Sequence, residues 1–193
     1  ASICKSNSTY TITGTTVTNS YQPITLANWT TTGTGTFTSS GNNLNPIYNP
    51  TAADKSASQV TLTLTVYPTS PCSTPKTGTI ILNFIPEPVA SAHVSPTRSQ
   101  CDTPFILAGT AATGTYSTLN WSTSGNGTFV GGIINTLNPT YTPSALDAQN
   151  SPITLTLTAN PIAPCAVPLV TTVLVSIVKS PTIVVTTQQP ICE

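Results

Sequence analysis

The sequence predicts an all-β protein made of tandem immunoglobulin-like (PKD-like) β-sandwich domains in an extended array, and three observations support this. The chain of 193 residues contains the same pattern of motifs twice. Its strand-length segments alternate threonine with aliphatic residues, and threonine suits a pleated, half-buried strand. One tryptophan falls on an early strand of each repeat. Short strands separated by turn signals, with a tryptophan on a central strand, are typical of an immunoglobulin-like sandwich.

The repeat is clearest around the two tryptophans. Residues 28–37, which contain Trp29, return as residues 120–129, which contain Trp121, at a displacement of 92 positions. Three further blocks follow in the same order at a displacement of 93: residues 44–50, 61–65 and 71–72 match residues 137–143, 154–158 and 164–165. Each repeat has the length of one small sandwich domain, about 90 to 100 residues. Tandem arrays supply length and copy number rather than one reactive centre.

The repeats set the expected domain boundaries. Residues 1–88 form the first repeat and residues 89–180 the second, joined by a short proline-containing connector at residues 86–92. Residues 181–193 repeat that connector and its cysteine, so we expect them to be the first strand of a following repeat. The sequence begins just before the second strand of a domain. The first strand of the first repeat is therefore expected to be missing or supplied from elsewhere.

The elements follow in the same order in both repeats. The best strands are residues 60–66 and 153–159, where strict alternation puts apolar side chains on one face and threonines on the other. The remaining strands are expected at residues 10–15 and 105–110, 27–31 and 119–123, and 79–85 and 170–178. Glycine pairs at residues 33–35 and 125–127 indicate hairpin turns. Helix is expected only as single turns at residues 51–55 and 144–149.

Composition excludes several function classes. Only 5% of the residues are charged and the formal net charge is zero, so the basic excess that attracts nucleic acid or anionic lipid is missing. No apolar run reaches the roughly 20 residues that span a bilayer, and we expect no membrane insertion in this segment. No signal peptide precedes Ala1, which indicates a processed protein or an excerpt from a longer one.

Several of these motifs resemble a known group of repeats. The residues that carry the likeness are 29–37, 45–54, 61–66 and the closing Ile191-Cys192-Glu193. In these residues the chain is similar to the Ig-like or PKD-like repeats of giant Bacteroidota cell-surface proteins. The resemblance covers essentially the whole chain. That group includes gliding-motility adhesins exported by the type IX secretion system. The resemblance implies an extracellular filament at the cell surface, attached to the outer membrane through the rest of the protein.

Five cysteines fit an exported array in an oxidising compartment: Cys4, Cys72, Cys101, Cys165 and Cys192. No CxxC motif occurs and the one histidine lies in the connector, so no zinc site is expected. The spacing leaves three pairings open. The in-repeat pairing joins Cys4 to Cys72 and Cys101 to Cys165. The sequential pairing joins Cys72 to Cys101 and Cys165 to Cys192.

The third pairing joins Cys4 to Cys165 and comes from the strand order. In an immunoglobulin-like order, Cys4 precedes the second strand and Cys72 follows the sixth, which runs in the same direction. One strand of about 3.3 Å per residue would separate the two cysteines by roughly 25 Å, and a disulfide tolerates about 7 Å between Cα atoms. End-to-end stacking of successive domains would instead bring Cys4 near Cys165.

The remaining polar and aromatic candidates have structural interpretations. Trp29 and Trp121 are expected in the core rather than stacked on sugars. Asp54 and Asp147 are expected to cap turns, because the five carboxylates do not cluster into a calcium site. His93 has no acid–base partner nearby in the sequence. We therefore expect no catalytic residue, no cofactor and no metal, and thus no enzyme.

These observations predict a structural and adhesive function. The segment would belong to a long surface fibre or stalk, with neighbouring repeats as partners and multivalency as the source of avidity. One alternative is a lectin-like module for surface polysaccharide, with Tyr67 and Tyr116 as exposed aromatic candidates. Another is a self-assembling fibre in which a segment of one subunit completes the domain of its neighbour by strand addition. The donor residues would be Thr182, Ile183, Val184 and Val185.

Overall fold

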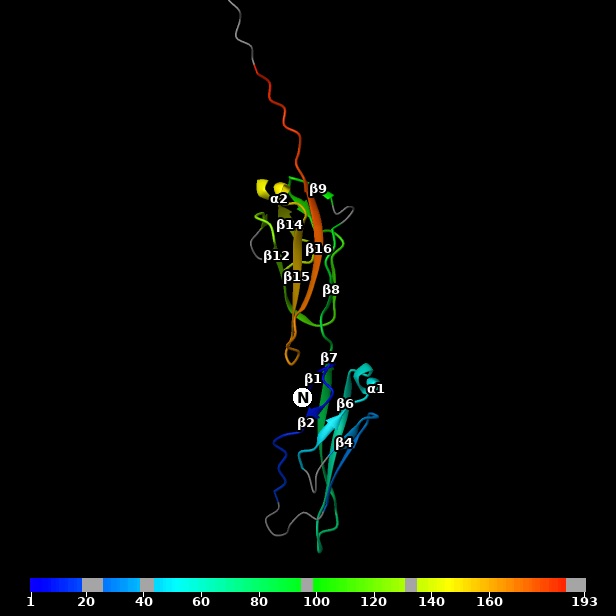
Figure 1. The fold of residues 1–193 in the computed structure, drawn as a ribbon. Coiled ribbons are helices and arrows are strands. Elements are labelled where there is room, and N and C mark those ends of the chain that lie inside the picture. Colours follow the sequence, from blue (N-terminus) through cyan, green and yellow to red (C-terminus); the bar gives the residue numbers. More distant parts are fainter. Residues whose placement is uncertain (19–25, 39–43, 95–98, 131–134, 187–193) are drawn as a thin grey trace, which may run out of the picture. The chain divides into compact units, whose positions relative to one another are not determined.

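The structure of the chain is a computed structural model, and it describes residues 1–18, 26–38, 44–94, 99–130 and 135–186. The chain divides into two compact units. Unit 1 comprises Ala1–Glu87 together with Pro161–Val167, and unit 2 comprises Pro88–Asn160 together with Pro168–Glu193. The ribbon in Figure 1 shows that both units consist mainly of strands. The prediction of an all-β, immunoglobulin-like sandwich is confirmed.

The described residues of unit 1 form two sheets and one helical turn. The larger sheet has the order β1-β7-β6-β3 and the smaller one the order β2-β5-β4. The larger sheet is built from β1 (Ser2–Cys4), β3 (Leu26–Thr31), β6 (Gln59–Tyr67) and β7 (Lys76–Ile85). The smaller sheet is built from β2 (Tyr10–Thr11), β4 (Thr36–Thr38) and β5 (Ile47–Asn49), and the helix is α1 (Ala52–Ser56).

Unit 2 repeats this arrangement and adds a third, two-stranded sheet. Its larger sheet has the order β12-β15-β16-β9, its smaller sheet the order β10-β14-β13, and β8 pairs with β11. The larger sheet is built from β9 (Ser99–Cys101), β12 (Tyr116–Thr123), β15 (Ile153–Pro161) and β16 (Leu169–Val178). The others are β8 (Val89–Ser91), β10 (Phe105–Ile106), β11 (Ala111–Thr113), β13 (Thr128–Phe129), β14 (Thr140–Thr142) and α2 (Ala145–Gln149).

The alternating strands supply the core of each unit. Every second residue of β6 and β15 is apolar and lies inside, while the threonines between them are more exposed. In unit 2, Leu155, Leu157 and Ala159 are fully buried. Because side chains alternate across a strand with a period of two, this pattern fixes which face of the sheet packs inward.

Two differences from the sequence predictions concern short elements. The strands expected at residues 10–15 and 105–110 stop after two residues, at Thr11 and Ile106. Gly14 and Gly109 follow with φ values of 73° and 86°, a conformation that only glycine adopts readily. Conversely, β1 and β9 pair in parallel with β7 and β16, so Cys4 ends a strand of its own. Three residues carry too little periodicity to be recognised.

Both single-turn helices are present, at α1 and α2. Among the residues that the structure describes, no helix has the length and apolar character needed to cross a bilayer.

Candidate functional site

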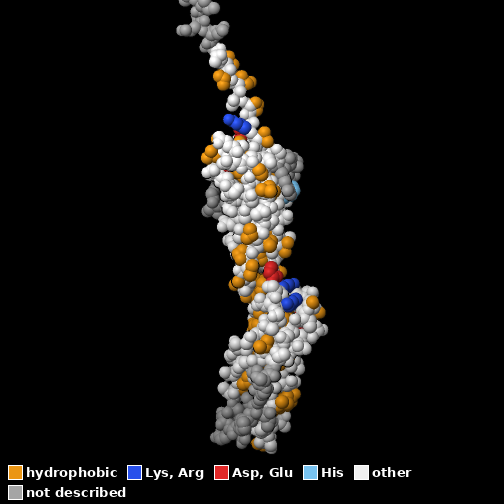
Figure 2. Space-filling view, in the orientation of Figure 1, with side chains coloured by type: hydrophobic (Ala, Val, Ile, Leu, Met, Phe, Trp, Pro, Cys, Tyr) orange, Lys and Arg blue, Asp and Glu red, His pale blue; other side chains and the backbone are white. Residues whose placement is uncertain are grey.

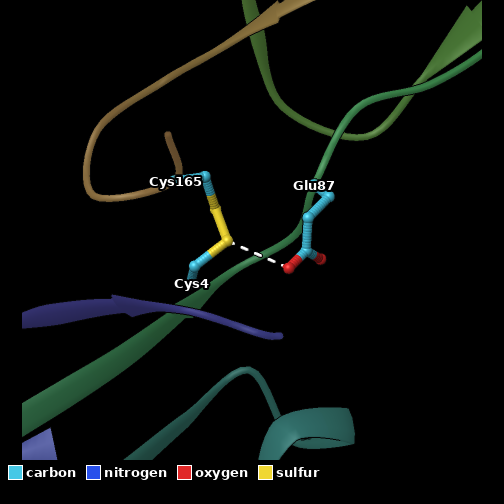
Figure 3. A group of neighbouring side chains, drawn as sticks. All are labelled: Cys4, Glu87 and Cys165. Carbon is cyan, nitrogen blue, oxygen red and sulfur yellow. Dashed lines mark hydrogen bonds between the residues drawn. A yellow bond between two sulfur atoms is a disulfide. The ribbon is translucent and has the colours of Figure 1, made fainter. Parts of the chain in front are cut away.

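The feature that sets unit 1 apart is a disulfide between Cys4 and Cys165, whose Cα atoms lie 4.9 Å apart. Cys4 ends β1, and Cys165 lies in Pro161–Val167. This segment connects β15 to β16 along the chain, yet it belongs to unit 1. Figure 3 shows Cys165 on its loop, reaching Cys4. The bond therefore links the first repeat to the hairpin loop of the second.

The structure contains the third of the three possible pairings, and the strand register explains why the in-repeat pairing does not form. Cys4 is paired with Ile85, at the C-terminal end of β7. Cys72 precedes Lys76, at the other end of the same strand. The ten residues of β7 span about 33 Å, which no disulfide bridges. Because Cys165 is already bonded to Cys4, the sequential pairing of Cys165 with Cys192 is also excluded in this structure.

A carboxylate lies against the disulfide. Glu87 Oε1 is 3.0 Å from Cys4 Sγ (Figure 3). The same oxygen accepts a hydrogen bond of 2.6 Å from the backbone N–H of Ser6. Hydrogen bonding to Ser6 holds the pKa of Glu87 below its usual range, against the opposing effect of burial. Ligand atoms of Cys4, Glu87 and Cys165 lie within 4.8 Å of one another. The disulfide occupies both sulfurs, whereas metals bind the free thiolate, so this cluster is a covalent link rather than a metal site.

Two further cysteines are free and exposed, Cys72 and Cys101. Cys72 lies in the loop between β6 and β7, and Cys101 ends β9. Cys192 lies outside the described residues. The cysteines therefore divide into a bonded pair and two accessible thiols.

A groove of about 770 Å³ opens on unit 1 beside one of the accessible thiols. Its apolar surface comes mainly from β3, β6 and β7. It is lined by Thr15, Thr16, Val17, Thr18, Trp29, Leu64, Val66, Tyr67, Pro68, Cys72, Ser73, Thr74, Lys76, Thr77, Gly78, Thr79 and Ile80. Charged side chains are sparse on the face drawn in Figure 2. Among the described residues that line the groove, Lys76 is the one that carries a charge.

The two tryptophans behave differently. Trp121 is 4% exposed, and its indole N–H donates to the carbonyl of Thr136 at 3.1 Å. Trp29 is only half-buried at the edge of the unit 1 core, where it lines the groove. Its Nε1 is shielded from solvent and has no hydrogen-bond partner among the described residues. Trp121 thus lies in the core of unit 2, whereas Trp29 lies at the edge of the unit 1 core.

Asp54 and Asp147 form the same buried network in both units. Each occupies the N3 position of a capping box, three residues after the N-cap Thr51 or Ser144. Each also accepts a 2.8 Å hydrogen bond from a buried tyrosine hydroxyl and a shorter one from the backbone of the glycine-containing turn. The tyrosines are Tyr48 and Tyr141. The two aspartates therefore join helix, strand and turn within each unit.

The electrostatics of this network follow from its hydrogen bonds. Burial alone would raise the pKa of Asp54 and Asp147, but the N–H and O–H donors around each carboxylate lower it below the usual range. Burial raises the pKa of Tyr141 to about 12, with a further contribution from the nearby Asp147 carboxylate. Each aspartate is therefore ionised and each tyrosine neutral near pH 7, which is the arrangement of a structural network.

The other predicted residues are scattered. Tyr67 lines the unit 1 groove, whereas Tyr116 packs against the core of unit 2. The backbone N–H of His93 donates to the hydroxyl of Thr110. Ile183, Val184 and Val185 are 90%, 82% and 82% exposed, and Thr182 is also exposed. Figure 1 shows this C-terminal segment of unit 2 as an extended trace. Sequence reasoning missed the groove. In unit 2 the corresponding place is closed by β8, which pairs with β11, and unit 1 has no equivalent strand among the described residues.

Comparisons with known proteins assign the chain to no family. No family model matches the sequence, and no curated protein matches it. A mouse nectin-like molecule 4 ectodomain is 13% identical with a TM-score of 0.39, over 83% of this chain and 57% of that one. The human desmocollin-1 ectodomain is 15% identical with a TM-score of 0.48, over 93% and 40%. Protocadherin gamma B2 extracellular cadherin domains 3–6 are 12% identical with a TM-score of 0.44, over 93% and 45%.

The chain thus spans 40% to 57% of the length of these three solved structures. The fold assignment rests on the strand order and the cores described above.

Proposed function

We propose that this chain is a structural and adhesive repeat segment of a long extracellular fibre or stalk at the cell surface. The observation that carries the proposal is the disulfide between Cys4 and Cys165, which joins two successive repeats. Disulfides persist in oxidising, extracellular settings. A chain of repeats linked in this way resists extension, because the peptide bond and the disulfide both connect one repeat to the next.

The sequence likeness to repeats of giant Bacteroidota surface proteins supports the finer form of the proposal. In that form the chain is part of a gliding-motility adhesin exported by type IX secretion and attached to the outer membrane through its other parts. The near-absence of charge, with 5% charged residues, suits a spacer that avoids non-specific electrostatic binding. Repetition of weak contacts along one fibre would supply avidity. The buried networks of Asp54 and Asp147 have structural partners only, which supports a non-enzymatic function.

The mechanical part of the proposal is tested by stretching single molecules. The two bonded cysteines are separated by 161 positions along the chain, which corresponds to about 550 Å of extended chain. We expect the oxidised protein to release this length only after a reducing agent is added. A variant with both Cys4→Ser and Cys165→Ser should release it without reduction. Equal extension of the oxidised and reduced protein would contradict the proposal.

The location is tested on intact cells of the source organism. An antibody against the chain should label the cell exterior, and added protease should remove the label. Beads coated with the antibody should be carried along the surface if the fibre belongs to a gliding adhesin. Labelling that appears only after lysis would contradict an extracellular location.

A second form of the proposed function is a fibre that assembles by strand donation, and the groove favours it. The groove lies along strands whose counterparts in unit 2 are covered by another strand. A lectin-like function for surface polysaccharide has weaker support, because its two candidate aromatic residues, Tyr67 and Tyr116, belong to different units and only Tyr67 lines the groove.

A further inference from the structure

The groove of unit 1 corresponds to the place that β8 occupies in unit 2. There β8 pairs with β11, with Ala112 opposite Ala90. Tyr10 pairs with Tyr48 in unit 1, and Phe105 pairs with the equivalent Tyr141 in unit 2. Tyr10 and Phe105 are therefore counterparts, and they lie 95 positions apart. At the same displacement, residues 16–18 are the counterpart of β11 in unit 1. Residues 16–18 line the groove and have no strand partner among the described residues.

The floor of the groove shows the same correspondence. Gly78 lies opposite Leu64, which in turn lies opposite Trp29. Directly opposite residues share one face of a sheet, so these positions face the groove together. A Cβ atom added to Gly78 would meet no atom within 4 Å. Its counterpart in unit 2, Thr171, accepts a hydrogen bond of 3.5 Å from the backbone N–H of Ala92, just beyond the end of β8.

Burial confirms that unit 2 is closed at this place and unit 1 is open. Val66 and Ile80 are half-buried in unit 1, whereas their counterparts Ala159 and Val173 are 0% and 3% exposed. The residues that close unit 2 come from β8 and the residues after it: Ala92 is 8% and Val94 1% exposed.

The chain contains a second segment of the β8 kind. Residues 181–186 follow β16 as residues 88–93 follow β7, at a displacement of 93. Ile183 and Val185 then correspond to Ala90 and Ala92, which face the core of unit 2. Val184 corresponds to the exposed Ser91. The segment is extended and exposed in this structure, and no described residue pairs with it in a sheet.

The two free cysteines repeat the positions of the bonded ones. Cys101 is paired with Val178 at the end of β16, as Cys4 is paired with Ile85 at the end of β7. The backbone N–H of Cys72 donates to the carbonyl three residues earlier at 3.0 Å, and Cys165 does the same at 3.0 Å. Cys101 is therefore the counterpart of Cys4, and Cys72 is the counterpart of Cys165. Both free cysteines are exposed.

From these correspondences we propose that a second copy of this chain inserts its residues 181–186 into the groove of unit 1 and forms a disulfide between its Cys101 and Cys72 of the first copy. The connection between two copies would then repeat the connection between the two repeats within one chain. The inserted strand and Cys101 belong to the C-terminal repeat of one copy, and the groove and Cys72 belong to the N-terminal repeat of the next. This inference rests on the strand-donating form of the proposed function. The extracellular location is tested separately, by the surface labelling of intact cells.

The disulfide step requires an oxidant, for which a low-molecular-weight disulfide is sufficient. The thiolate of Cys101 attacks the disulfide, one thiol leaves, and a mixed disulfide forms. The thiolate of Cys72 then displaces the second small thiol. Two protein thiols are thereby oxidised to one disulfide, and the oxidant is reduced to two thiols.

The test uses the full chain with Cys192→Ser, so that Cys72 and Cys101 are the free thiols, and oxidised glutathione as oxidant. One variant also carries Cys72→Ser and keeps only the donor thiol, and another carries Cys101→Ser and keeps only the acceptor thiol. We expect the mixture of the two variants to give at least about tenfold more covalent dimer than either variant alone. Peptide mapping should find Cys72 linked to Cys101, and the parent chain should form a ladder of oligomers.

The inserted strand is tested in the same mixture by changes in the donor segment. These residues are exposed in the free chain, so their substitution leaves folding intact. Replacing Ile183 and Val185 with Asp should slow cross-linking about tenfold or more, because burial of each apolar side chain is lost. The matched control, Val184→Asp, changes the outward-facing position and should alter the rate less than twofold.

Three results would overturn the proposal. A dimer yield from either variant alone that equals the yield from the mixture would indicate random oxidation of exposed thiols. A Cys72–Cys101 bond in a chain of monomeric mass would indicate that the segment folds back into its own groove. Equal rates for the Ile183/Val185 variant and the Val184 control would exclude insertion of this face of the segment.

Discussion

The two repeats have closely matched sequences, and they differ in how one edge of the sandwich is closed. In unit 2, Ala90 of β8 and Ala92 just after it pack against the core, and Trp121 is 4% exposed with its N–H bonded to Thr136. In unit 1, the corresponding place remains a groove, and Trp29 is half-buried with Nε1 unpaired among the described residues. A matched strand pattern thus produces matched sheets, but closure of the core depends on a segment outside that pattern.

The networks around Asp54 and Asp147 show the opposite behaviour. They have equivalent capping boxes, tyrosine partners and turn contacts in the two units. All of these partners lie within 21 residues of the aspartate along the chain. Features built from such local partners are therefore reproduced in both repeats, whereas, among the residues that the structure describes, the covering strand is present in only one repeat.

The largest expected effect concerns the tryptophans. Trp121→Ala should lower the free energy of unfolding of unit 2 by about 4 kcal/mol, the cost of removing a large buried aromatic side chain. Trp29→Ala should cost unit 1 about 2 kcal/mol, because this side chain is only half-buried. Native-state hydrogen exchange of β15 and β6 measures the two units separately. Equal losses would contradict the difference in closure.

The aspartates should show no such difference. Asp147→Asn and Asp54→Asn should each cost about 3 kcal/mol in their own unit, because an amide cannot accept all the bonds that the buried carboxylate accepts. Chemical denaturation followed by hydrogen exchange measures both effects. The matched control is Asp102→Asn, a more exposed carboxylate that is bonded to Ser180, which should change neither unit measurably. A loss confined to one unit would show that the two networks are not equivalent.

Acid should weaken both units, by less than these substitutions do. The folded-state pKa of Asp54 and of Asp147 is lowered, and the unfolded value is about 3.9. The stabilisation is therefore fully present above about pH 4 and is lost as pH falls through the folded-state pKa. The protonated carboxyl keeps its shape and some hydrogen bonds, which limits the loss. Urea unfolding at pH 5 and below pH 4 should show a smaller drop in an Asp54→Asn, Asp147→Asn double variant than in the parent chain.

The smallest expected effect concerns the floor of the groove. Gly78→Thr should stabilise unit 1 by about 0.5 to 1 kcal/mol, because it reduces the freedom of the unfolded chain and the added side chain meets open space. The reciprocal change, Thr171→Gly, should destabilise unit 2 by about 1 kcal/mol. Thermal unfolding monitored by hydrogen exchange distinguishes the units. Destabilisation by Gly78→Thr would show that the groove is smaller than described.

Much of the fold could be predicted from the sequence, because its signals are local. The alternating strands β6 and β15 and the helical turns α1 and α2 lie where the pattern of residues predicts them. The strands β1 and β9 were missed, because three residues show no period and their parallel partner lies more than 70 residues away. The incomplete burial of Trp29 was missed too, because its motif is nearly identical to that of Trp121.

The candidate site depended more on tertiary structure. The sequence identified the cysteines and left three pairings open. The register of β1 against β7 excludes the in-repeat pairing, and the loop Pro161–Val167 brings Cys165 to Cys4. That the two free cysteines occupy the positions of the two bonded ones becomes visible only when the two units are compared.

By itself, the sequence determined the class of fold, the repeat and the face that each long strand buries, because alternation and turn residues act within a few positions of each other. Tertiary structure decided which cysteines meet and which sandwich is closed. Both depend on residues from distant parts of the chain, Cys4 with Cys165 in one case and β8 with β11 in the other. Such contacts are set by strand register and by which segment reaches an open edge, and neither is recorded in a local pattern.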